Sequence, residues 1–163
     1  MTALALGTAV RPPERGAAHE AFFAWSFPVE IDAPPALLPG ARALVARLER
    51  LWNPTVDGSD LQRVYARIGT MVPVEPETVA LVGLATRAAW RLPSPPMALH
   101  DVVIDARRNR VGLPDGDLLD FRVMVPVLTA ALLVRYLDGN GADVVRVRVG
   151  DTLRVAEPRP HAA

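Results

Sequence analysis

Apolar residues alternate along the segment 22–31. Positions 23, 25, 27, 29 and 31 are all apolar, and alanine, serine, proline and glutamate stand between them. A period of two is typical of a strand with one buried face. The alternation therefore predicts a single half-buried strand over 22–31. Pro28 has no N–H to donate to a neighbouring strand, which favours either a strand at the edge of the sheet or a register in which residue 28 faces that edge.

Three segments follow the 3.6-residue period of an amphipathic helix. The clearest is 36–52, where leucine, valine and alanine recur at i, i+3, i+4 and i+7. A second helix is expected over 60–71 and a third over 76–91, with Pro76 suited to its first turn. The first half of the chain is therefore predicted to be mainly helical after its opening strand.

The second half contains more strand signals. Residues 99–105 predict a strand that turns and returns over 110–113. The apolar segment 118–137 contains Pro126 and leaves two interpretations open. It forms either one helix kinked at Pro126, which we favour, or a strand followed by a helix with Pro126 near its first turn.

The chain closes with a predicted hairpin whose strands cover 143–149 and 153–156. A two-residue loop would place Arg154 on the same face as Val147. A three-residue loop instead gathers all the apolar residues on one face, so we predict the three-residue loop. The outer face would then carry three arginines: Arg146, Arg148 and Arg154.

This order of elements predicts an α+β fold. We expect a single domain over 19–157, in which an antiparallel sheet packs on three to four helices and a β-hairpin closes the chain. Residues 1–18 are rich in small residues and predict a flexible tail, and residues 158–163 predict a second, shorter one.

Composition excludes several kinds of site. The chain of 163 residues has no cysteine, so it has no disulfide, thiolate nucleophile or cysteine-ligated metal. Its 18 basic residues, all arginine, balance 18 acidic ones, which argues against nucleic-acid binding. The excess of arginine over lysine, with much alanine and little isoleucine, indicates the codon bias of a GC-rich bacterial genome.

The apolar stretches are too short for membrane insertion, since a spanning helix needs about 20 apolar residues. The start of the chain also lacks the basic region of a signal peptide. We therefore expect a cytoplasmic protein.

Few polar residues predict chemistry. His100, Asp101 and Asp105 lie close together in the strand 99–105, but a regular strand would point His100 away from the two carboxylates. Asp117 and Asp120 are placed to cap the helix that follows them. We therefore expect no metal site and no cofactor, and only the outer arginine face of the closing hairpin is predicted to bind a ligand or partner.

The scarcity of clustered catalytic residues favours a non-catalytic role. We predict an accessory, adaptor or structural subunit that binds another protein or a second copy of itself. The alternative is a small α+β enzyme or ligand-binding domain. Its pocket would lie between the helices and the sheet, near His100, Asp101 and Asp105.

Overall fold

The computed structural model describes residues 16–89, 101–115, 120–143 and 145–156. Its larger sheet is antiparallel and four-stranded, in the order β1-β2-β6-β7. The strands are β1 Ala18–Ala24, β2 Phe27–Ala33, β6 Val145–Val149 and β7 Thr152–Ala156. The predicted α+β class is confirmed.

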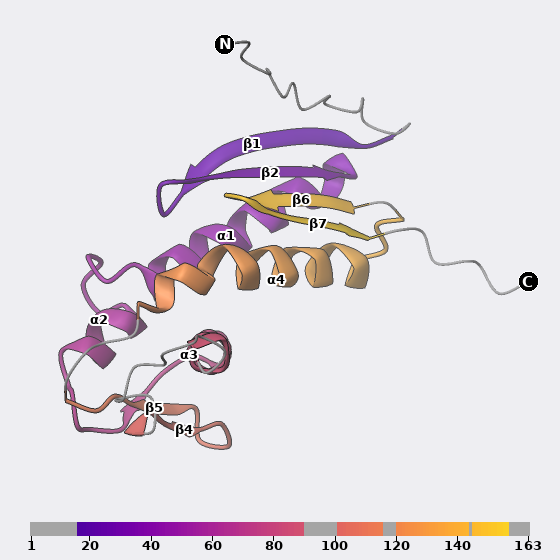
Figure 1. The fold of residues 1–163 in the computed structure, drawn as a ribbon. Helices are drawn as coiled ribbons and strands as arrows, with labels where there is room; N and C mark the ends of the chain where they lie inside the picture. Colours follow the sequence, from indigo (N-terminus) through magenta and orange to yellow (C-terminus); the bar gives the residue numbers. More distant parts are fainter. Residues whose placement is uncertain (1–15, 90–100, 116–119, 144, 157–163) are drawn as a thin grey trace, which may run out of the picture.

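Two long helices cover one face of this sheet (Figure 1): α1 Leu38–Trp52 and α4 Val125–Gly139. The buried residues of β2 and β6 point toward these helices and form the first core with Val45, Leu133 and Leu137. The helices approach closely at Gly40, where a Cβ atom would lie 1.9 Å from the Tyr136 hydroxyl oxygen. A side chain at position 40 would therefore force the Tyr136 ring to move.

A second, smaller sheet lies at the far end of α1, in the order β3-β5-β4. Its strands are β3 Val72–Pro73, β4 Val103–Asp105 and β5 Arg110–Gly112, and it lies beside α2 Asp60–Tyr65 and α3 Pro76–Ala89. The second core forms here around Trp52, Leu81 and Phe121. Trp25 and Leu44 pack against both cores, so they connect the two halves of the molecule.

The predicted helices are present, with one shortened. The 36–52 helix corresponds to α1 after a 3-10 turn, η1 Pro35–Leu37, and the third helix corresponds to α3 as far as Ala89. The second helix was predicted to run to residue 71, but α2 ends at Tyr65. Turns lead from there into β3, and Gly69 adopts a φ of 74° in them.

The single strand predicted over 22–31 is wrong. Two strands cover this segment, and β1 pairs with β2 through a turn at Trp25 and Ser26. Both turn residues have a positive φ, 49° and 68°, as a type I′ hairpin turn requires. Such turns usually contain asparagine and glycine, so a tryptophan–serine pair gives no recognisable signal.

Of the two positions expected for Pro28, the edge strand is wrong. The strand that contains Pro28, β2, lies between β1 and β6. Pro28 is tolerated there because the β2–β6 ladder begins one residue later, at the pair Val29 and Val149. No hydrogen bond of that ladder requires the N–H that proline lacks.

The kinked helix that we favoured for 118–137 is wrong. The other interpretation is correct in placing Pro126 near the start of a helix, but a 3-10 turn, and no strand, precedes that helix in the described residues. This turn, η3 Phe121–Met124, continues directly into α4. Pro126 lies in the first turn of α4, where its missing N–H would have had no partner within the helix. The helix therefore needs no kink at this proline.

The three-residue loop of the closing hairpin is wrong as well. Val149 pairs with Thr152 across a two-residue loop, and Arg154 lies opposite Val147. Gly150 supplies the positive φ, 54°, that such a short loop needs. Leu153 and Val155 are therefore 47% and 58% exposed on the outer face of the edge strand β7.

Among the residues that the structure describes, no helix is both long and apolar enough to cross a membrane. The two predicted tails fall almost wholly outside the described residues, although β1 already begins at Ala18.

Candidate functional site

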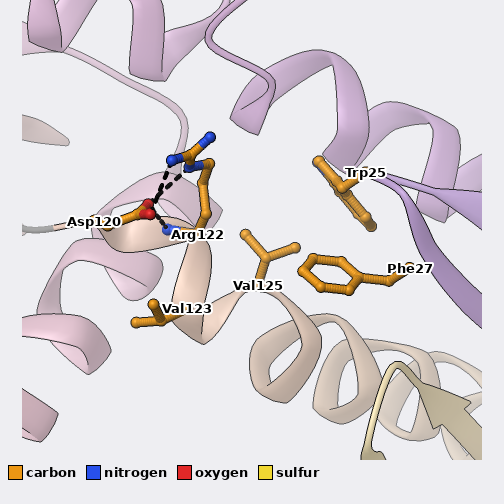
Figure 2. A pocket seen from close by; sticks show the side chains of 6 residues that line it. All are labelled: Trp25, Phe27, Asp120, Arg122, Val123 and Val125. Atoms are coloured by element: carbon orange, nitrogen blue, oxygen red, sulfur yellow. Dashed lines mark hydrogen bonds and ion pairs between the residues drawn. The ribbon is translucent and has the colours of Figure 1, made fainter.

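A hollow of about 240 Å³ opens where the β1–β2 turn meets the start of α4. We call it the aromatic hollow. Figure 2 shows Val125 pointing toward the rings of Trp25 and Phe27, while an ion pair lies on the other side. Its described lining residues are Trp25, Phe27, Asp120, Arg122, Val123 and Val125.

The aromatic wall is held by α1. The backbone N–H of Trp25 donates a 2.9 Å hydrogen bond to the Glu49 Oε1 atom. The Trp25 ring stacks on Trp52, with ring centroids 6.0 Å apart and planes inclined by 24°. Because Glu49 and Trp52 lie three residues apart, both project from the same side of α1. One helix face therefore fixes both the backbone and the ring of Trp25.

The polar wall is an ion pair at the start of η3. The Asp120 carboxylate accepts hydrogen bonds from the Arg122 backbone N–H at 3.0 Å and from its guanidinium at 2.8 and 2.9 Å. Asp120 thus caps the 3-10 turn that leads into α4, and Asp117, the other predicted cap, lies outside the described residues. The guanidinium hydrogen bonds lower the pKa of Asp120 and raise the pKa of Arg122. Both groups are therefore charged at neutral pH.

A stacked aromatic pair, the partly buried Tyr65 and the buried Phe121, lies next to the ion pair. Tyr65 stacks on Phe121, with centroids 6.0 Å apart, and its hydroxyl has a hydrogen bond with the Phe121 backbone. Burial raises the pKa of Tyr65 above its ordinary value, so the phenol is neutral at physiological pH. Tyr65 thus anchors the 3-10 turn that carries Arg122.

Asp101 and Asp105, two residues of the alternative pocket predicted from the sequence, are not among the described residues that line the aromatic hollow. His100 lies outside the described residues, and Asp101 is exposed. Asp105 accepts a 3.1 Å hydrogen bond from the Arg108 backbone N–H, which stabilises the turn between β4 and β5. Asp105 therefore has a structural role in the small sheet.

The predicted arginine face is divided by the register of the closing hairpin. Arg146 and Arg148 remain on the outer face, but Arg154 alternates with Leu153 and Val155 and so points to the other face. Glu30 lies 3.8 Å from Arg148, which neutralises part of this face. The ligand-binding role of the three arginines stays a prediction. The single shared face on which we based it is not present.

Sequence reasoning assigned the residues of the hollow to other roles. It placed Trp25 and Phe27 in one strand and gave Arg122 no role. The one local signal was a positively charged residue two positions after a capping aspartate. In the described segments no group of three or more histidine, aspartate or glutamate residues could hold a metal ion.

Comparisons with known proteins reveal likeness in structure alone. No protein-family model matches the chain, and no curated protein matches its sequence. The ApbE protein of Thermotoga maritima has a similar structure, with a TM-score of 0.71 and 16% identity over 88% of this chain.

Two flavin transferases have the same fold. The flavinyl transferase ApbE of Pseudomonas stutzeri matches 89% of this chain with a TM-score of 0.69 and 16% identity. The flavin transferase ApbE of Vibrio cholerae matches 85% with a TM-score of 0.68 and 15% identity. The match spans 60%, 63% and 62% of the length of the three solved chains.

The likeness overturns the predicted non-catalytic accessory or adaptor role. Solved proteins with this arrangement of elements include flavin transferases, which are enzymes. The comparison therefore favours the alternative reading, an α+β enzyme or ligand-binding domain. At this level of identity the comparison establishes the fold alone: this chain folds like about three-fifths of each of these ApbE proteins.

Proposed function

We propose that this chain binds a flavin in the aromatic hollow, as the flavin-binding part of an enzyme that transfers a flavinyl group. One observation carries the proposal. A tryptophan and a phenylalanine face an arginine ion pair in a single hollow, within a fold that flavin transferases have. The transfer activity is inferred from those relatives.

The shape and chemistry of the hollow suit the flat isoalloxazine ring. Trp25 and Phe27 offer aromatic surface for stacking, and Val125 offers an apolar floor. A volume of about 240 Å³ is smaller than the roughly 300–1,000 Å³ of most ligand pockets. The hollow is therefore suited to the ring, with the rest of a flavin nucleotide extending past the exposed Val123.

Two polar groups add to this match. The indole Nε1 of Trp25 is buried and has no hydrogen-bond acceptor among the described residues. An unpaired buried donor is costly, and the edge of isoalloxazine carries carbonyl oxygens and ring nitrogens that accept hydrogen bonds. Arg122 is suited to a flavin phosphate, because a guanidinium binds phosphate through paired hydrogen bonds.

Binding is tested by titrating the protein with riboflavin, FMN and FAD while following flavin and tryptophan fluorescence. We expect all three to bind the wild type. Trp25→Ala should weaken binding by roughly five- to 150-fold, since stacking on an aromatic ring contributes roughly 1–3 kcal/mol.

Phe23→Ala is the matched control. Phe23 lies two residues before Trp25, is 76% exposed and does not line the hollow, so its removal should leave the dissociation constants unchanged. Failure of the wild type to bind any of the three flavins would refute the proposal. Equal losses in the two variants would place the binding site elsewhere.

A further inference from the structure

A buried carboxylate lies behind the aromatic wall. Asp60 is the first residue of α2 and is only 2% exposed. One of its oxygens accepts a hydrogen bond from the Arg63 guanidinium. The other accepts from the Glu75 backbone N–H at 2.7 Å and from the Thr78 hydroxyl at 2.6 Å. Every one of these donors is a protein group, so the carboxylate is held in one orientation.

The hydrogen bonds continue from Asp60 to the stacked tryptophans. The Thr78 hydroxyl donates its proton to Asp60 and accepts a 3.1 Å hydrogen bond from the Trp52 indole N–H. A hydroxyl has a single proton. Because the Thr78 proton points at the carboxylate, the oxygen lone pairs that accept the Trp52 hydrogen bond are fixed in direction. Trp52 and Thr78 are both fully buried, and no solvent competes for these bonds.

The series of contacts that begins at Asp60 ends at the aromatic hollow. Trp52 stacks on Trp25, and Trp25 lines the hollow. Apolar packing alone would leave an aromatic ring free to settle in the best available fit, whereas a hydrogen bond at Nε1 selects one ring orientation. The carboxylate therefore acts on the wall of the hollow without touching a ligand.

We propose that Asp60 is a positioning residue for flavin binding: through Thr78 it fixes the ring plane of Trp52, and Trp52 fixes the ring plane of Trp25. This inference rests on the proposed function for its ligand. The positioning of the Trp52 and Trp25 rings can be tested on the free protein without a ligand. The position of the Trp25 ring is thus determined by the ends of three helices, α1, α2 and α3.

Thr78→Val tests the connection, because it keeps the shape of the side chain and removes the hydroxyl. Removing the Asp60 carboxylate itself would leave Arg63 unpaired and could unfold the protein. Two stacked indoles give an exciton couplet in the far-ultraviolet circular dichroism spectrum, and Trp25→Ala provides the spectrum without it. We expect Thr78→Val to lose at least half of the couplet.

The same variant should bind riboflavin roughly two- to tenfold more weakly, the factor that corresponds to one lost hydrogen bond. Thr78→Ser keeps a hydroxyl and should restore both the couplet and the affinity. Thr129→Val is the matched control. Thr129 is also fully buried, but its hydroxyl has no partner among the described residues, so both readouts should stay at the wild-type level.

Two outcomes overturn the inference. Thr78→Val could lower the melting temperature while the couplet and the riboflavin affinity stay unchanged, which would make the network purely structural. Thr129→Val could reduce both readouts as much as Thr78→Val, which would make the effect non-specific. If the wild type binds no flavin, the proposed function fails, and the couplet of the free protein still decides whether Thr78 positions the tryptophans.

Discussion

The two hairpins of the larger sheet close through two-residue turns at the same end, yet they use opposite kinds of residue. Trp25 and Ser26 form the first turn, with φ of 49° and 68°. Gly150 begins the second, with φ of 54°. The Gly150 N–H donates a 2.9 Å hydrogen bond to the Pro28 carbonyl oxygen, so the two turns lie side by side.

The difference shows where the fold tolerates strain. Glycine adopts a positive φ freely, whereas a residue with a Cβ atom loses about 1–2 kcal/mol there. The Glu49 hydrogen bond and the Trp52 stack hold Trp25 in this conformation. The strained turn lines the aromatic hollow and the relaxed turn does not, which agrees with the concentration of backbone strain at functional sites.

Removing the support of the strained turn should have the largest effect. Glu49→Ala leaves the Trp25 N–H without its acceptor. We expect a loss of about 1–3 kcal/mol in the free energy of unfolding, measured by urea denaturation, together with weaker flavin binding. Glu49→Gln keeps a side-chain oxygen and should retain most of both. Unchanged stability in Glu49→Ala would show that the turn does not depend on α1.

Adding a side chain to the relaxed turn should cost less. Gly150→Ala forces alanine into a positive φ, and its Cβ atom would lie 3.4 Å from Phe27 Cδ1. We expect about 1–2 kcal/mol of destabilisation by the same denaturation assay. The converse change, Ser26→Gly, relieves strain in the first turn and should leave stability equal or slightly higher. A destabilised Ser26→Gly would contradict the assignment of strain to that turn.

The charges beside the strained turn should contribute least to stability. Asp120→Asn removes the partner of Arg122, and because both side chains are partly exposed, the expected loss is at most about 1 kcal/mol. The freed guanidinium should bind FMN and FAD more tightly and riboflavin unchanged. An equal change in affinity for all three flavins would show that Arg122 does not bind the flavin phosphate.

The pH dependence of stability follows from the lowered pKa of Asp120. The unfolded carboxyl takes up its proton near the ordinary pKa of about 3.9, before the folded one does. The stabilisation is complete above that pH and is lost as the pH falls through the lower pKa of the folded state. The stability difference between wild type and Asp120→Asn should therefore shrink in acid, and a constant difference would contradict the ion pair.

Patterns along the sequence predicted the helices, because neighbouring residues determine where a helix forms. The period of α1 and the position of Pro76 at the start of α3 were readable because a helix is determined by neighbours along the chain. The α+β class followed from the order of such elements. The register of the closing hairpin was wrong because an exposed edge strand does not need to bury Leu153 and Val155.

The aromatic hollow could not be predicted in the same way. Trp25 adopts its turn conformation because of Glu49, which lies 24 residues away, and Arg122 comes from a distant 3-10 turn. Asp60 was absent from the candidates, since a carboxylate at a helix start is usually only a cap. These roles arise from contacts between elements, and a pattern along the chain does not record them.

The position of Arg154 on β7 also bears on solubility. An edge strand that exposes Leu153 and Val155 is a template onto which a second strand could add. Arg154 is the only charged residue of β7, and it lies at the centre of the strand. Two copies that paired antiparallel about this residue would bring two guanidinium groups together and repel each other. The arginine thus protects the sheet edge against aggregation.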